Sequence, residues 1–442
     1  MKEKSNTSFG TWVAKLAIMI AVCLVATSAA GQVAAEVDSV KVDPSKKRLA
    51  ILPVKVSKQY DVTNLIHDVL HPKGKPDSTR RRSGINIVPN ISSNPSIGQQ
   101  IGIKAVVGRV LGSDPRTYLS VAATSASITT KDIIYFYLYH NIFTNGNKRN
   151  LTGIIAAGKA VVPDYGLGIG SNSSGAKANG ILTNPGRQAY GLKGQLFTFR
   201  EKSYKEIKEN LYLGIGLSFD IRRKFEDLGS SGITTPYDIY SDKHGFSRSS
   251  YSSNGILLDL QYVTRDNQNR AYKGVYFDVG LKSNQTWLGS SRQANQFTYD
   301  FRKYVGLSKS NPEHLIAFWN WGSFLLGGNL AYLDLPGTQK DPSLRSGRGY
   351  TIGYFKGTQY NDTEVEYRFP ITKNKFISGV AFFNLQTAND DSGTAIFEVF
   401  QPGAGAGLRV LFNKVTRTNL CLDYAFGKFG QKGFFLGLNE AF

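Results

Sequence analysis

Residues 211–221 read Leu-Tyr-Leu-Gly-Ile-Gly-Leu-Ser-Phe-Asp-Ile, so a large apolar side chain occupies every second position. The positions between them hold tyrosine, glycine, serine or aspartate. Side chains of a β-strand alternate between its two faces, so this stretch predicts a strand with one apolar face and one small or polar face. Similar stretches recur up to the C-terminal residue, Phe442. Many strands with this split are typical of a membrane β-barrel that has lipid outside and a polar lumen inside.

Sixteen such stretches follow one another from residue 83 onward. They cover residues 83–93, 98–109, 116–126, 131–143, 150–161, 193–203, 210–222, 254–264, 272–282, 295–305, 313–322, 358–370, 375–384, 404–412, 418–426 and 433–442. Long segments rich in Gly, Ser and Asn separate them at 162–192, 223–253, 323–357 and 385–403, and each follows an odd-numbered strand. The four segments therefore fall at one end, as the long extracellular loops of outer-membrane barrels do.

We therefore expect an all-β fold: a transmembrane antiparallel β-barrel of about 16 strands over residues 83–442, with both chain ends in the periplasm. A soluble β-sandwich is the alternative, because its strands alternate in the same way. The loops of a sandwich would not sort by length onto one end. After residue 35 no apolar run approaches the roughly 18–20 residues that a membrane helix needs, so we expect no spanning helix in the mature chain.

Residues 1–30 have the features of a secretory signal peptide, and cleavage would remove them. Three lysines lie before or beside the apolar stretch Leu16–Ala26, and Ser28-Ala29-Ala30 offers small residues for cleavage. An uncleaved N-terminal anchor is the alternative. Residues 31–82 are expected to form a short periplasmic leader. Apolar residues between Val62 and Leu70 have the spacing of one small amphipathic helix within it.

The chain is strongly basic, with 53 Lys and Arg against 33 Asp and Glu and a formal charge of +20. One cluster is Arg222-Arg223-Lys224. For an exported chain we expect outer-membrane lipids and lipopolysaccharide as partners, and no nucleic acid. Solvated charge without an assigned partner is the alternative.

No arrangement of residues indicates an enzyme. The chain has five histidines, and no Ser-His-Asp arrangement, metal-ligand spacing or glycine-rich phosphate loop stands out among them. We therefore expect no catalytic residue, no metal and no cofactor. Cys421 is the one cysteine left after signal cleavage, and it shares the polar parity of Asn419 and Asp423, which predicts a packed thiol in the lumen.

Several segments of the chain resemble a known family. They are the turn Thr264–Asn267 with Gly274, then Ser346–Gly357, Glu364–Ile371, Gly403–Val410 and Gly433–Phe442. The second reads Ser-Gly-Arg-Gly-Tyr-Thr-Ile-Gly-Tyr-Phe-Lys-Gly. In content and order these segments resemble the BamA/TamA family, the bacterial surface-antigen barrels. The resemblance covers roughly residues 83–442.

The resemblance implies that the sixth extracellular loop folds into the lumen of a sixteen-stranded barrel. The loop-lock motif falls on Arg348, Gly349, Tyr350, Gly353 and Gly357. Its arginine would bind carboxylates on the inner wall, a pairing that the planar guanidinium favours. Glu366 matches one wall partner, and the second falls on Asn384, which is neutral. In the alternative, Arg348 occupies a solvated loop tip.

The resemblance also assigns a role to the chain's final strand. Phe434, Leu436, Leu438 and Phe442 share one parity, and this pattern is the signal recognised during outer-membrane insertion and barrel closure. The final strand would meet the first strand at a weak seam that opens toward the bilayer. Pro89 in the first strand is compatible with that seam or with a simple bend.

Two functions remain open from the sequence. The first is a BamA/TamA-type protein in the cell outer membrane that assists insertion or translocation of proteins or lipids, with client outer-membrane proteins or a periplasmic partner. Family members with this activity carry periplasmic POTRA repeats, and the leader 31–82 is shorter than one repeat. The alternative is a passive channel or structural barrel.

Overall fold

A computed structural model describes most of the chain from residue 59 onward. The described residues are 59–62, 64–65, 68, 85–89, 92–94, 98–111, 114, 117–130, 133–169, 189–228, 234–391, 393–414 and 416–442. The expected signal peptide (1–30) and most of the expected leader lie outside them. Within the leader, Val62, Asn64, Leu65 and Asp68 are helical, as the apolar spacing predicted. The backbone N–H of Leu65 donates to the Asp61 carbonyl at 3.0 Å.

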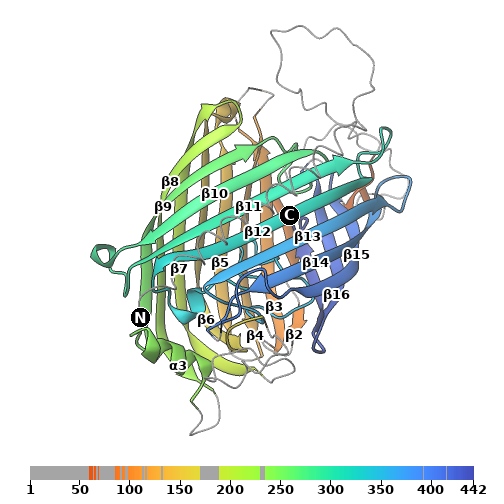
Figure 1. Cartoon of the computed structure of the whole chain (residues 1–442). Helices are drawn as coiled ribbons and strands as arrows, with labels where there is room; N and C mark the ends of the chain where they lie inside the picture. Colours follow the sequence, from red (N-terminus) through yellow and green to blue (C-terminus); the bar gives the residue numbers. More distant parts are fainter. Residues whose placement is uncertain are drawn as a thin grey trace. The chain divides into compact units, whose positions relative to one another are not determined.

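Seventeen strands form one antiparallel sheet (Figure 1). They are β1 (Ile85–Pro89), β2 (Ser92–Asn94), β3 (Gly98–Val110), β4 (Leu119–Thr129), β5 (Ile134–Phe143), β6 (Arg149–Asp164), β7 (Tyr190–Lys208), β8 (Leu211–Asp227), β9 (Tyr251–Val263), β10 (Gly274–Asn284), β11 (Ala294–Gly306), β12 (Leu315–Gly328), β13 (Gln359–Pro370), β14 (Ile377–Ala388), β15 (Gln401–Asn413), β16 (Thr418–Gly427) and β17 (Lys432–Leu438).

The strands are paired in chain order, and the first one is described in two parts. From β3 to β17 each strand pairs with the next, whereas β1 and β2 both pair with β3. Their register on β3 is continuous, from Pro89 opposite Ile103 to Ser92 opposite Gln100, so they are two described parts of one strand; residues 90–91 lie outside the described residues. Counted in this way, the sheet has the sixteen strands that the sequence predicted. Among the described residues no ladder joins β17 to β1 or β2.

The two faces of the sheet confirm the predicted alternation. On β8, Leu213, Ile215 and Leu217 are 55, 61 and 42 % exposed, whereas the neighbouring residues Tyr212 and Ser218, on the opposite parity, are buried. Large apolar side chains thus cover the outside, and buried polar side chains line the inside. This distribution is the reverse of that in a soluble protein and is the one that a transmembrane barrel requires.

The connections also sort by length, as predicted. Long ones follow β6, β8, β12 and β14 at one end, and the other end has short turns such as residues 209–210 between β7 and β8. Short helices lie in several connections. They are α3 (Pro236–Lys243), whose N-terminus is capped by Thr235, and the single 3-10 turns η3 (Asn145–Asn147), η5 (Thr286–Leu288) and η6 (Tyr332–Asp334).

Among the residues that the structure describes, no helix combines the length and the apolar character needed to cross a membrane.

The predicted end of the last strand is wrong. β17 ends at Leu438, and Asn439 adopts φ = 67°, which turns the backbone out of the ladder. Phe442 is therefore buried inside the barrel, with its ring 5.2 Å from that of Trp319 on β12. The pattern misleads because the tail has polar partners in the lumen that an extended strand could not reach.

The four residues of the predicted insertion signal consequently do not share one environment. Phe434 and Leu436 are 71 and 50 % exposed on the outer face of β17. Leu438 has the same parity but is buried, in one cluster with Val106 of β3 and Val121 of β4. The end of β17 thus packs near the second and third strands of the barrel.

Candidate functional site

The connection 329–358, between β12 and β13, folds back on itself and onto the inner wall. Gly337 and Lys356 form an isolated antiparallel bridge, and Lys356 forms a second one with Gly168 in the connection after β6. Further along, the Tyr350 hydroxyl donates to the Pro402 carbonyl at 2.5 Å and accepts from the Lys428 N–H at 2.9 Å. The connection therefore has fixed contacts on several strands.

Glycine is required at the point where this connection passes the wall. Gly349 has φ = 105°, and a Cβ there would lie 2.8 Å from the Phe426 carbonyl oxygen of β16. A side chain would therefore meet both backbone strain and a clash. Gly353 and Gly357 lie nearer the base of the connection, where their N–H groups donate to the carbonyls of Thr338 at 2.9 Å and Pro336 at 3.1 Å.

Arg348 is the centre of a buried cluster of carboxylates and is itself only 2 % exposed. Its guanidinium binds Glu364 and Glu366 of β13, and Nη1 donates to Asp423 Oδ2 of β16 at 2.9 Å. The guanidinium carbon also lies 3.5 Å from the ring centroid of Phe382 on β14. One loop side chain thus bridges three strands of the wall.

The charge of Arg348 is secured by these contacts. Burial opposes the charged form, but the three carboxylates outweigh burial and raise the pKa of the guanidinium above its usual value. Arg348 therefore stays charged at every physiological pH. The cluster can act as a permanent lock on the loop, because removing the guanidinium would leave the buried Glu364 without its arginine partner and would take one of the arginines that Glu366 and Asp423 each contact.

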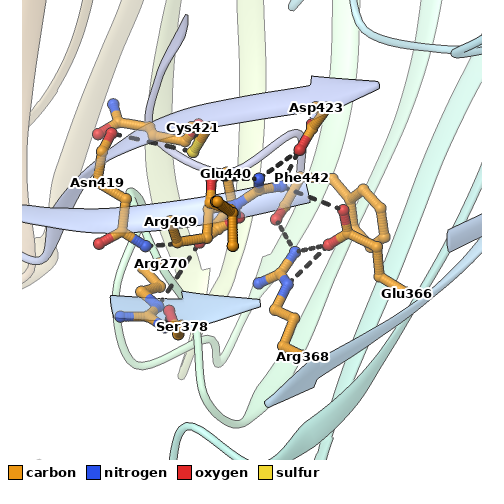
Figure 2. Close-up of polar contacts among 12 residues, drawn as sticks. Arg270, Glu366, Arg368, Ser378, Arg409, Asn419, Cys421, Asp423, Glu440 and Phe442 are labelled. Atoms are coloured by element: carbon orange, nitrogen blue, oxygen red, sulfur yellow. Dashed lines mark hydrogen bonds and ion pairs between the residues drawn. The ribbon is translucent and has the colours of Figure 1, made fainter. Parts of the chain in front are cut away.

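A second part of the network holds the C-terminal tail (Figure 2). Arg409 of β15 binds Asp423, and its Nε lies 2.6 Å from Glu440 Oε2. The Glu440 carboxylate also accepts from Asn419 Nδ2 at 2.7 Å and lies 3.5 Å from Arg270 Nε. Burial opposes ionisation of Glu440, but the neighbouring arginines outweigh it and hold the pKa of that carboxyl well below its usual range.

The terminal residue is bound by the same wall that binds the loop. Arg368 of β13 donates to the Phe442 carbonyl oxygen at 3.0 Å, and its Nε donates to Glu366 at 2.7 Å. Glu366 is thus shared between Arg368 and Arg348, and Asp423 is shared between Arg348 and Arg409. Loop, wall and tail form one continuous ion network, and Figure 2 shows its wall and tail residues.

The Omp85 superfamily domain matches residues 168–442, which is more than half of the chain. The chain belongs to the Omp85 superfamily. This membership agrees with the resemblance to BamA/TamA-like barrels and supports an outer-membrane location. No match was found among curated proteins.

Solved structures with a similar chain path include other outer-membrane proteins. BamA from Haemophilus ducreyi lacking POTRA domains 1–3 is 14% identical, with 81% of this chain and 70% of that chain covered and a TM-score of 0.49. CdiB from Escherichia coli is 9% identical, with 81% and 60% covered and a TM-score of 0.45. CdiB from Acinetobacter baumannii is 11% identical, with 80% and 58% covered and a TM-score of 0.42.

The structure brings the expected site residues of this Omp85 barrel together, with one change of role. Arg348 contacts Glu366, and Tyr350 lies in the same connection against β15 and β16. Asn384 Nδ2 donates to the backbone carbonyl of Arg348 at 2.8 Å, so Asn384 binds the loop backbone and does not stand in for a carboxylate. The further acceptors are Glu364 and Asp423.

Asn384→Asp is therefore expected to loosen the loop, the opposite of what an additional acceptor would do. An aspartate would lose the donor to the Arg348 carbonyl and would lie opposite Glu364, its register partner on β13. Protease cleavage within 329–358 should be faster than in the wild type. Asn384→Gln, which keeps the amide, is the control. Slower cleavage of Asn384→Asp would contradict this role for Asn384.

Most residues of the ion network were not identified from the sequence, although the alternation already placed several of them on the lumen-facing side of their strands. Glu364 and Arg368 have the parity of Glu366, and Asp423 has the polar parity of β16. Parity pointed to neither Glu440 nor Arg270: Glu440 shares the lipid-facing parity of the expected strand 433–442, and Arg270 lies outside every expected strand.

Proposed function

We propose that this Omp85 barrel assists the insertion or translocation of proteins or lipids at the outer membrane, through the seam between its first and last strands. The seam is the observation that carries the proposal. Among the described residues β17 has no ladder with β1 or β2, and Leu438 instead lies in one buried apolar cluster with Val106 of β3 and Val121 of β4. Opening such a seam would break few backbone hydrogen bonds, and its free edges could pair with an added strand.

The ion network offers a means of controlling this seam. Arg348 binds Asp423 on β16, and Arg345 Nη2 lies within 3.4 Å of the Leu438 carbonyl oxygen on β17. Glu440 continues directly from β17 into the network. We propose that the docked loop and tail hold the last two strands, and that their release accompanies passage of a client. The proposal includes client outer-membrane proteins or a periplasmic partner, and it assigns no catalytic step to this chain.

A seam locked by a crosslink should lose insertion activity. The test uses Val106→Cys with Leu438→Cys in a Cys421→Ser background, joined by a reducible crosslinker in liposomes. Insertion of an unfolded outer-membrane client is followed by its protease protection. We expect the locked barrel to be inactive and reduction to restore activity.

The matched control is a crosslink between Leu408→Cys and Leu422→Cys, which are register partners within the continuous wall. It should leave insertion unchanged. Equal insertion by locked and unlocked seam variants would contradict the proposal. Steady ion conductance without any client insertion would instead support the passive-channel function.

A further inference from the structure

The basic triplet Arg222-Arg223-Lys224 is divided between the two faces of the wall. Arg222 faces the lumen, where its Nη2 lies 3.5 Å from Asp220 and 3.7 Å from Asp334. Arg223 and Lys224 are exposed. Ordinary strand alternation separates Arg222 from Arg223, and a bulge explains why Lys224 is exposed as well, because the β7–β8 register shifts between Lys193 and Gln195 and Lys224 adopts φ = 52°.

Arg223 belongs to a polar row across three strands on the outer face. Lys159 of β6 is the register partner of Gln195 of β7, which is in turn the partner of Arg223 of β8. Hydrogen bonds fix the guanidinium: Nη1 donates to the Tyr251 carbonyl at 2.8 Å, and Nη2 donates to Ser252 Oγ at 3.2 Å. We call Lys159, Gln195 and Arg223 the basic row.

The basic row borders the apolar band of the barrel. Two residues from Gln195 and Arg223, toward the middle of β7 and β8, the next outward-facing side chains are Phe197 and Ile221, which are register partners. A surface hollow of about 340 Å³ is lined by the basic row together with Phe197 and Ile221. Beyond them the Phe199 and Phe219 rings lie 6.2 Å apart. A cationic edge above aromatic and aliphatic side chains matches a molecule with an anionic head and apolar chains.

The position along the strands indicates which leaflet would supply that molecule. All three residues of the basic row lie near the strand ends that join the long connections after β6 and β8. Long connections mark the extracellular end of an outer-membrane barrel. The basic row would therefore face the outer leaflet, whose lipid in this membrane is lipopolysaccharide.

We propose that the basic row binds a phosphate group of the lipid A part of lipopolysaccharide, with acyl chains against Phe197 and Ile221. The three side chains contain no carboxylate. The acidic residue nearest to the row in the β7–β8 pairing is Glu226, and its register partner is the basic residue Lys193. This assignment rests on the outer-membrane location in the proposed function, but it needs neither the seam nor a client.

Native mass spectrometry of the purified barrel in detergent, titrated with bisphosphorylated lipid A, tests the assignment. Each basic residue near an anionic lipid surface contributes about 1 kcal/mol, so Lys159→Ala and Arg223→Ala should each weaken binding about fivefold and together about 25-fold. Gln195→Glu, which adds a negative charge within the row, should weaken binding at least as much as either single change. Dephosphorylated lipid A should bind the wild type no better than it binds the double variant.

Arg109→Ala is the matched control, because Arg109 is an exposed arginine at the other end of the wall, on β3. It should bind lipid A like the wild type. Equal weakening by Arg109→Ala, or displacement of lipid A by equimolar phosphatidylglycerol, would show a general basic surface and overturn the proposal. Because no client is present, failure of this test would leave the seam proposal unaffected, and failure of the seam test would leave this one unaffected.

Discussion

Arg348→Ala should release the connection 329–358 from the lumen while the barrel still assembles. The substitution removes the guanidinium that contacts Glu364, Glu366 and Asp423. Breaking a buried ion pair typically costs about 3–5 kcal/mol, and Arg348 is buried enough for that range to apply. The strands themselves keep their ladders. Limited proteolysis should therefore cut within 329–358, while heat-modifiable migration in gels persists.

A second substitution separates loss of the lock from general damage. Arg348→Ala combined with Glu364→Gln removes one of the stranded charges and should recover part of the protease resistance. The two changes should therefore be strongly non-additive, because they remove partners of one network. A cleavage pattern for Arg348→Ala that equals the wild type would mean that Arg348 does not hold the loop. Loss of the folded barrel would mean that the cluster supports the wall itself.

Phe442→Ala should destabilise the assembled barrel far more than Phe434→Ala. The Phe442 ring is buried against Trp319, and replacing a buried phenylalanine by alanine costs about 3–5 kcal/mol. Phe434 is 71 % exposed on the outer face of the same terminal segment, so its loss opens no cavity and should have the smaller effect. The measurement is the temperature at which the compact form is lost in gels of heated samples.

Phe442→Asp distinguishes the two roles that a terminal aromatic can have. As an insertion signal, Phe442 acts before closure, so the variant should assemble poorly but be stable once folded. As a lumenal anchor, it acts after closure, so the folded variant should lose its compact form at a lower temperature. We expect the second effect in the purified barrel. Equal thermal stability of Phe442→Asp and the wild type would exclude the anchoring role.

The strands were predictable because their signal is local. On β8 the apolar positions from Leu211 to Ile221 needed only a period of two, and the same period assigned Glu366 and Asp423 to the lumen. Boundaries were less certain: the stretch expected at 193–203 extends over β7, Tyr190–Lys208. Cross-strand hydrogen bonds set the ends of a strand, and these depend on its neighbours.

The sequence alone therefore determined the sixteen strands, their two faces, the end that carries the long connections and the inward position of Arg348 implied by its motif. The tertiary structure alone decided which carboxylates Arg348 meets and where the tail goes. The alternating pattern predicted Phe442 at the end of a lipid-facing strand. Glu440 leaves the strand because Arg270 and Arg409, far from it in the sequence, converge on its carboxylate in the lumen. The two-residue period shows which face of the sheet a side chain occupies. It does not show which charged residues, distant in the sequence, become neighbours when the sheet folds.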